Sequence, residues 1–217
     1  MRIGTVSLLL VTAIAPLSAQ ASGAGRSGPR PILAPAEERA LARSAAPASI
    51  SADATVWLFT RGGWVVGDSG TSGAACLVSR SWPESLEPEC FDPEAAATIM
   101  PIEMRRTELL HQGMRIEEVD QEIARELMTG RFRLPSRMAV AYMMSARQRL
   151  VSDDGTPAGA WRPHLMIYSP FLTNAQVGHQ ATPGLAAGMV VDPGLPTANL
   201  MVVVPAFAEV PGAAVGP

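Results

Sequence analysis

The hydrophobic positions of the chain alternate at first, then follow a helical period, and then alternate again. Alternating apolar residues in 55–66, interrupted by a Gly-Gly turn, predict a β-hairpin, and residues 74–79 predict a third strand. Residues 100–112 and 116–129 predict two helices, and the second carries one apolar stripe that stops before Gly130. Strand patterns return at 138–144, 164–169, 189–191 and 200–204.

This order of elements predicts an α+β domain. We expect a mainly antiparallel sheet of about six to seven strands, with the helix pair packed on one face, because strands, helices and strands follow one another in blocks. A short helix is also expected in residues 35–46, which are rich in Ala, Glu and Arg behind a proline. The chain shows no alternating strand–helix rhythm and no Gly-rich strand-to-helix turn, which argues against a doubly wound nucleotide-binding fold.

The first 21 residues have the three regions of a secretory signal peptide. Arg2 precedes an apolar run, and Ala19 and Ala21 form a small-x-small site, so we expect cleavage after Ala21. An uncleaved membrane anchor is the alternative, but the run is shorter than the roughly 20 apolar residues of a span. We therefore predict a signal peptide (1–21), a disordered tether (22–34), a single domain (35–208) and a frayed tail (209–217).

Charge and composition narrow the expected partners. The net charge of −3 gives no basic patch for nucleic acid, and no membrane association is expected after cleavage, so a small molecule or a protein is the expected ligand of a periplasmic or extracellular module. All 17 basic residues are Arg. The absence of Lys excludes a Schiff-base mechanism, a Ser-Lys dyad and a P-loop.

Cys76 and Cys90 are the only cysteines of the chain. In an oxidising compartment an even number favours a disulfide, which would contribute about 3 kcal/mol by closing a short loop. The alternative is a hydrolase in which Cys76, or an unrecognised serine, is the nucleophile and His164 the base.

The candidates for a catalytic or ligand-binding site are His164, Tyr168 and Arg80. A period of two places His164 and Tyr168 on the same face of a predicted strand. The other histidines, His111 and His179, form no metal motif with it, because the sequence contains neither HExxH nor a CxxC pair. We expect no metal and no cofactor, and the many methionines are expected to fill the core rather than bind copper.

Four segments resemble a group of uncharacterised exported bacterial proteins: residues 76–83, 89–94, 141–145 and 163–170. The resemblance covers about residues 40–205 and implies that the cysteine loop and the His164 strand belong to one unit. It implies no activity. The sequence therefore predicts an exported α+β protein that acts as a binding or structural module.

Overall fold

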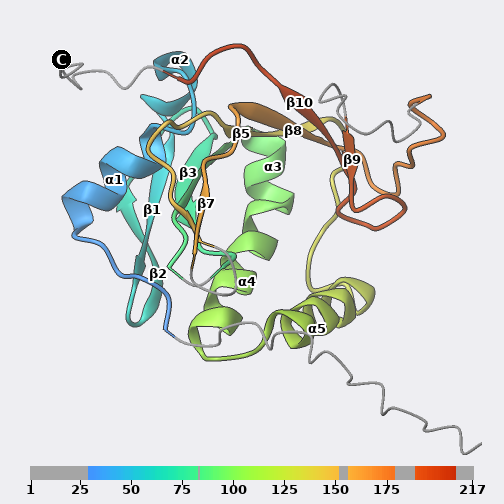
Figure 1. Ribbon diagram of the computed structural model, residues 1–217, viewed down its shortest axis with the longest axis horizontal. Helices are drawn as coiled ribbons and strands as arrows, with labels where there is room; N and C mark the ends of the chain where they lie inside the picture. The colour runs from blue at the N-terminus through green and yellow to red at the C-terminus, as the bar shows by residue number, and fades with distance from the viewer. Residues whose placement is uncertain (1–28, 83, 152–155, 179–188, 209–217) are drawn as a thin grey trace, which may run out of the picture.

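Helices cover both faces of a central sheet. The computed structural model describes residues 29–82, 84–151, 156–178 and 189–208. Seen in Figure 1, α1 (Pro35–Arg43) and α2 (Ala48–Ser51) lie on one side of the strands, and α3 (Pro93–Thr98) and α4 (Met100–His111) lie on the other. A further helix, α5 (Ile116–Met128), packs beside α4 at the edge of the molecule.

The main sheet contains eight strands in the order β2-β1-β3-β4-β5-β8-β10-β9. All neighbours run antiparallel except β1 and β3, so the predicted mixed fold with a mainly antiparallel sheet is confirmed. Two short strands, β6 (Leu150–Val151) and β7 (Pro157–Gly159), form a separate pair. The bounds of the eight are β1 (Thr55–Thr60), β2 (Gly63–Asp68), β3 (Ala75–Ser79), β4 (Glu87–Phe91), β5 (Ala139–Met143), β8 (His164–Tyr168), β9 (Met189–Val191) and β10 (Asn199–Val203).

The predicted count of six to seven strands is wrong because β4 was not foreseen. Its sequence contains two glutamates and Pro88 and therefore shows no strand pattern, although all five of its residues are buried in the middle of the sheet. A proline lacks the N–H that a central strand needs on both sides. Here β4 pairs with β5 only at Cys90 and Phe91, so Pro88 lies beyond that ladder.

The predicted placement of the helix pair also needs correction. Only α4 reaches the sheet, whereas the apolar stripe of α5 packs on α4: Val119 and Ile123 share a buried cluster with Ile102 and Leu110. The helices therefore do not lie side by side on one face. The short helix α2 was not predicted; α3 begins at the N-cap Asp92, whose carboxylate accepts a hydrogen bond from the Ala95 N–H at 2.7 Å.

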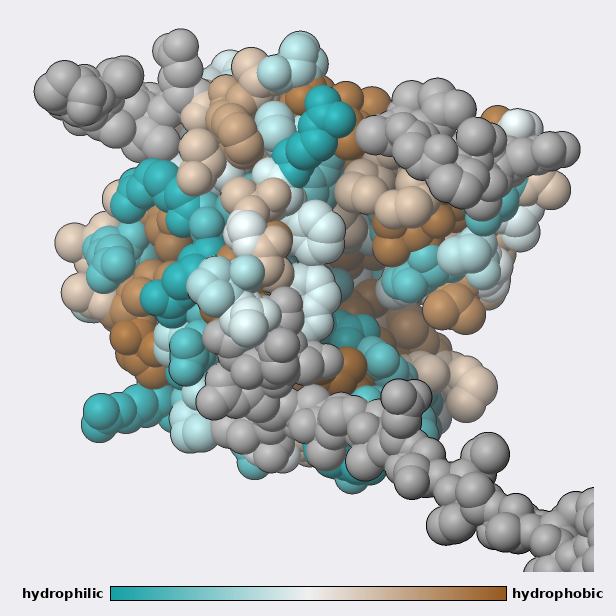
Figure 2. Space-filling model, in the orientation of Figure 1, coloured by the Kyte–Doolittle hydropathy of each residue, from teal (hydrophilic) through white to brown (hydrophobic). Residues whose placement is uncertain are grey.

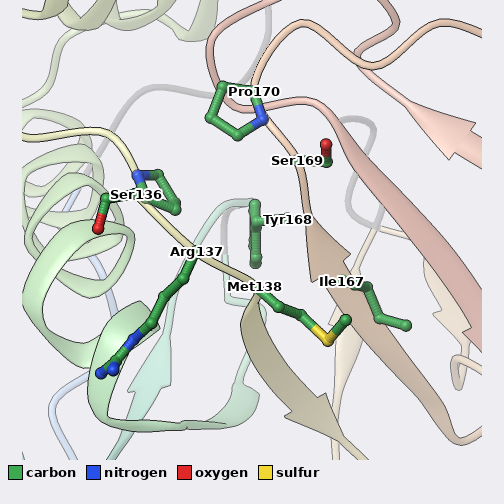
Figure 3. Close-up of a pocket in the computed structure, with 8 residues that line it drawn as sticks. Ser136, Arg137, Met138, Ile167, Tyr168, Ser169 and Pro170 are labelled. Carbon is green, nitrogen blue, oxygen red and sulfur yellow. The ribbon is translucent and has the colours of Figure 1, made fainter.

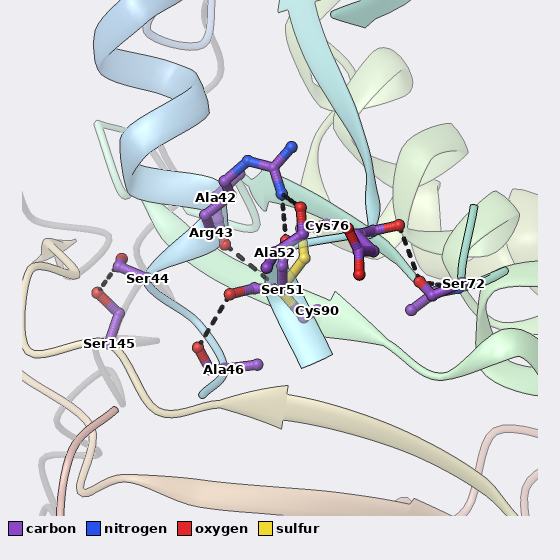
Figure 4. Close-up of a disulfide and its surroundings, with 12 residues drawn as sticks. Ala42, Arg43, Ser44, Ala46, Ser51, Ala52, Ser72, Cys76, Cys90 and Ser145 are labelled. Carbon is purple, nitrogen blue, oxygen red and sulfur yellow. Dashed lines mark hydrogen bonds between the residues drawn. A yellow bond between two sulfur atoms is a disulfide. The ribbon is translucent and has the colours of Figure 1, made fainter. Parts of the chain in front are cut away.

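The predicted disulfide between Cys76 and Cys90 is confirmed. The two residues stand directly opposite each other on β3 and β4, and both are completely buried. Figure 4 shows the bond close to Ala42 of α1, whose carbonyl oxygen lies 3.5 Å from Sγ of Cys90. It belongs to the core on this side of the sheet, which α1 closes with Leu41 and Ala42.

The folded region begins earlier than the predicted domain boundary at residue 35. Arg30 is 2% exposed, and its backbone N–H donates to Nδ1 of His111 at 2.9 Å. Arg30, which falls in the predicted tether, is therefore packed against the domain. The predicted signal peptide (1–21), residues 22–28 of the tether, His179 and the tail (209–217) lie outside the described residues.

Candidate functional site

His164 and Tyr168 share one face of β8, as the alternation predicts. Both are buried, and they stand on the side of the sheet that α3 and α4 cover, where Tyr168 joins the apolar cluster. Nδ1 of His164 lies 2.7 Å from the carbonyl oxygen of Arg162, and the ring meets Trp161 edge-on at 6.2 Å. Burial lowers the pKa of His164, although the Arg162 carbonyl opposes the shift, so the ring is neutral at pH 7 and Nδ1 carries the proton.

The third candidate, Arg80, belongs to a different cluster. It is fully buried just after β3, where its guanidinium pairs with Glu38 of α1 at 2.9 Å and lies 5.0 Å from the ring centre of Phe59. Its Nε donates to the carbonyl of Pro31 at 2.7 Å. These contacts tie α1 and the N-terminal segment to the end of the sheet, so we assign Arg80 a structural role.

The disulfide removes Cys76 as the nucleophile of the alternative hydrolase. Cys76 is bonded to Cys90 and carries no thiol, so it is not available as a nucleophile for His164. The hydrogen bond of the His164 ring is to a backbone carbonyl, and no serine hydroxyl among the described residues is bonded to it.

Two glutamates that the sequence analysis did not single out lie on the same face of the sheet. Glu89 is directly opposite Leu77, and Glu87 is directly opposite Ser79. Because side chains two residues apart share a face, both point to the side on which Phe91 packs against α3 and α4. Glu87 is 4% exposed and Glu89 is 5% exposed.

Burial changes the acidity of this carboxylate pair. It raises the pKa of Glu87 to about 7, against the hydrogen bond that the Ser81 N–H donates to Oε1 at 3.0 Å. Burial raises the pKa of Glu89 well above its ordinary value too, and the nearby carboxylates of Glu103 and Glu87 add to the shift. Desolvation and like charges both disfavour ionisation, and here they act together.

Acidic residues from other elements lie near Glu87 and Glu89. Glu103 of α4 has a raised pKa, because burial and the charges of Asp192 and Asp120 outweigh the attraction of Arg106. Burial also raises the pKa of Tyr168, together with the charges of Glu103, Glu89 and Asp192. We call Glu87, Glu89, Glu103 and Asp192 the acidic cluster.

The surface beside this cluster is concave. Figure 2 shows a hollow between the β9–β10 hairpin and α5. The cluster draws its members from β4, from α4 and from the turn that follows β9. Segments far apart in the sequence therefore meet at one site.

The buried carboxylates are not neutralised by ion pairs. Within the described residues, no arginine forms a salt bridge with Glu87, Glu89 or Glu103. Three buried atoms on this face form no hydrogen bond of standard geometry: Oε2 of Glu89, Oγ of Ser79 opposite Glu87, and Oδ1 of Asn199 opposite Tyr168. The Ser79 hydroxyl is nevertheless close enough to Glu89 to oppose the rise in its pKa. Buried polar atoms without partners are rare in folded proteins, which makes this face unusual.

A shallow cavity of about 330 Å³ opens at the end of β8. Figure 3 shows it between the segment that leads into β5 and the end of β8, with Arg137, Met138 and Ile167 among its lining residues. Arg137 pairs with Glu94 at 3.1 Å, and Met138 is 69% exposed. The cavity holds no buried polar group that lacks a partner, so it is the weaker candidate; Tyr168 borders both sites.

Among the described residues, no group of three or more His, Cys, Asp or Glu is arranged to hold a metal ion. No helix in this part of the chain is long and apolar enough to cross a membrane.

No family model matches the sequence, and comparisons with curated proteins and with solved structures found no similar protein.

Proposed function

We propose that this chain is an exported binding protein and that its ligand contacts the acidic cluster. One observation carries the proposal: among the described residues, Glu89 is a buried carboxylate in the middle of the sheet that forms no ion pair, and the Ser79 hydroxyl is the one hydrogen-bond donor that acts on it. Its neighbours Glu87 and Glu103 add negative charge rather than neutralise it.

Such an arrangement is unfavourable for the folded protein alone. An unsatisfied buried polar atom costs about 1–3 kcal/mol, and more when it is charged. Carboxylates with strongly shifted pKa values are found preferentially at functional sites, where a ligand or a reacting group completes the environment. A bound ligand would supply the missing partners.

Export rests on two observations. The first 21 residues have the pattern of a signal peptide, and the buried disulfide is consistent with an oxidising compartment. The resemblance to uncharacterised exported bacterial proteins supports the same proposal. Periplasmic and extracellular locations both agree with these observations.

The binding site is tested by thermal denaturation of the mature protein with a panel of solutes: glucose, citrate, leucine and spermine. At least one solute is expected to raise the melting temperature of the wild type, because a ligand that binds only the folded state stabilises it. Glu89→Gln is expected to abolish that shift. Glu37→Gln, an equal change at an exposed position of α1, is the control and is expected to retain it.

Two results would contradict the binding site. If no solute stabilises the wild type, the panel gives no support to a site at this face and the proposal fails. A shift that survives in Glu89→Gln places the ligand elsewhere and has the same consequence.

Export is tested on the full chain produced in a bacterium with a secretion pathway. N-terminal sequencing of the mature protein is expected to begin at Ser22, and alkylation without reduction is expected to modify neither cysteine. A chain that keeps Met1, or that takes up two alkyl groups, would contradict export or oxidation, respectively.

A further inference from the structure

The segment directly before α1 is held to the domain by side chains from two distant elements. We call residues 30–34 the N-terminal strap; Figure 1 shows it, in blue, running from α1 towards the end of α4. The backbone N–H of Arg30 donates to Nδ1 of His111, the last residue of α4, at 2.9 Å. Nε of Arg30 donates to the carbonyl oxygen of Arg80 at 3.2 Å, and Nε of Arg80 donates to the carbonyl oxygen of Pro31 at 2.7 Å. The strap is therefore attached both to the end of β3 and to the end of α4.

The bond to the strap determines which form of the His111 ring is compatible with the closed arrangement. Because Nδ1 accepts the Arg30 N–H, this nitrogen carries no proton, and the neutral ring has its proton on Nε2. A proton on Nδ1 would place two donors against each other and remove the bond. The closed strap therefore requires the neutral form of His111.

The position of His111 in the helix favours the opposite form. The last turn of a helix presents carbonyl groups with partial negative charge, which stabilise a protonated histidine. His111 is the basic residue of the last turn of α4. Histidine is also the side chain whose charge ordinarily changes between pH 5 and pH 8. A proton and the Arg30 N–H therefore compete for the same ring nitrogen in a mildly acidic range of pH.

The other charged groups near His111 come from α1, from α4 and from the end of β3. The ring of His111 packs edge-on against Phe59 with the ring centres 5.0 Å apart, and the Arg80 guanidinium lies 5.0 Å from the centre of the same phenyl ring. Glu38 of α1 pairs with Arg80 and also accepts the Phe59 N–H, each at 2.9 Å. Glu108, one turn before His111, pairs with an arginine of its own helix at 3.7 Å. Both of these carboxylates are thus already paired with an arginine.

We propose that the N-terminal strap is a latch that acid releases: protonation of His111 breaks its bond with the Arg30 N–H and frees the strap from the end of α4. Arg30, which is 2% exposed in the closed arrangement, then reaches solvent, and Arg80 loses the Pro31 carbonyl as an acceptor. The closed arrangement binds one proton fewer than the open one, so a fall in pH shifts the equilibrium towards opening. The latch uses no residue of the acidic cluster and is independent of the proposed binding function.

The test is hydrogen exchange of the Arg30 amide in the mature protein at pH 7.5 and pH 5, measured by NMR and expressed relative to an unstructured peptide at the same pH. In wild type the protection of this amide is expected to fall about tenfold at pH 5, because a hydrogen bond of ordinary net strength is lost. His111→Asn places a carbonyl oxygen near the position of Nδ1 and does not titrate, so it is expected to retain the protection at both pH values. His111→Phe removes the acceptor and is expected to give low protection at both. The Ile123 amide of α5 reports on the stability of the whole domain and serves as the internal reference.

Three results would overturn the latch. Protection of the Arg30 amide that does not change with pH in wild type shows that acid leaves the strap closed. An equal fall in His111→Asn, which retains Glu38, Glu108 and Arg80, assigns the opening to another group. A fall that the Ile123 amide shares reports loosening of the whole domain rather than release of the strap. The latch also requires the ring protons of His111 to titrate with the same midpoint as the loss of protection, and a different midpoint contradicts it.

Discussion

Arg80 and Glu89 are both buried charged residues, but among the described residues only Arg80 has an ion-pair partner. The guanidinium of Arg80 has Glu38 at 2.9 Å and backbone carbonyls around it, whereas the carboxylate of Glu89 has no ion pair among the described residues. Burial lowers the pKa of Arg80 and raises that of Glu89, because in both cases it disfavours the charged form. The first arrangement is typical of a structural pair and the second of a binding site.

The Arg80 pair is tested by removing the charge of its partner. Glu38→Gln leaves a buried guanidinium uncompensated and is expected to lower the free energy of unfolding by about 3 kcal/mol. Replacement of both residues, with Glu38→Gln and Arg80→Met, is expected to recover part of the loss. Chemical denaturation measures all three proteins, and a single variant as stable as wild type would contradict the structural role.

The acidic cluster makes a prediction about pH. In the folded state the pKa of Glu87 is raised to about 7, so the folded protein holds a proton that the unfolded chain has lost above its ordinary value of 4.5. The contribution of Glu87 to stability is therefore full below pH 4.5 and is lost as the pH rises to about 7. The loss is on the order of 3 kcal/mol.

Glu87→Gln removes this titration. The stability of the variant relative to wild type is expected to increase between pH 5 and pH 7.5, and His164 cancels in the difference because both proteins contain it. Denaturation curves at several pH values provide the measurement. A difference that stays constant with pH would show that Glu87 titrates normally.

At the scale of elements, the sequence predicted those whose pattern is local. The stripe of α5 and the alternation of β1 and β8 are visible in short windows, and the structure contains all three. Strand β4 was missed because its glutamates and Pro88 give no strand pattern. Its extended conformation is stabilised by pairing with the neighbouring strands β3 and β5. The candidate site was largely missed for the same reason, since Glu87 and Glu89 lie on that strand and meet Glu103 only in the folded chain.

The packing of α5 on α4 is tested by truncating one side chain of the apolar stripe of α5. Ile123→Ala removes a buried side chain from the cluster that joins α5 to α4 and is expected to cost about 2–4 kcal/mol. Met128→Ala on the same helix is the control, because Met128 is 83% exposed and its loss is expected to change stability by less than about 0.5 kcal/mol. Equal effects of the two changes would show that the α4–α5 contact is not formed.

For the whole molecule, the disulfide joins strands at the centre of the sheet rather than at its rim. Replacement of Cys76 and Cys90 by alanine is expected to lower the stability by about 3 kcal/mol, because the bond closes a loop with a sequence separation of 14. Denaturation of the variant, and of wild type with and without a reducing agent, provides the measurement. Unchanged stability in the variant would mean that strand pairing alone holds β3 to β4.

The location of this bond also bears on the order in which the chain can assemble. Cys76 and Cys90 are close in sequence, so the β3–β4 hairpin can be oxidised before more distant partners have arrived. Strand β1, which lies earlier in the chain, then adds to one edge of this covalent hairpin, and β5, which lies later, adds to the other. If the chain is exported as proposed and crosses a membrane unfolded, such a hairpin is a template that exists only after translocation, and recombinant production in a reducing cytosol would begin folding without it.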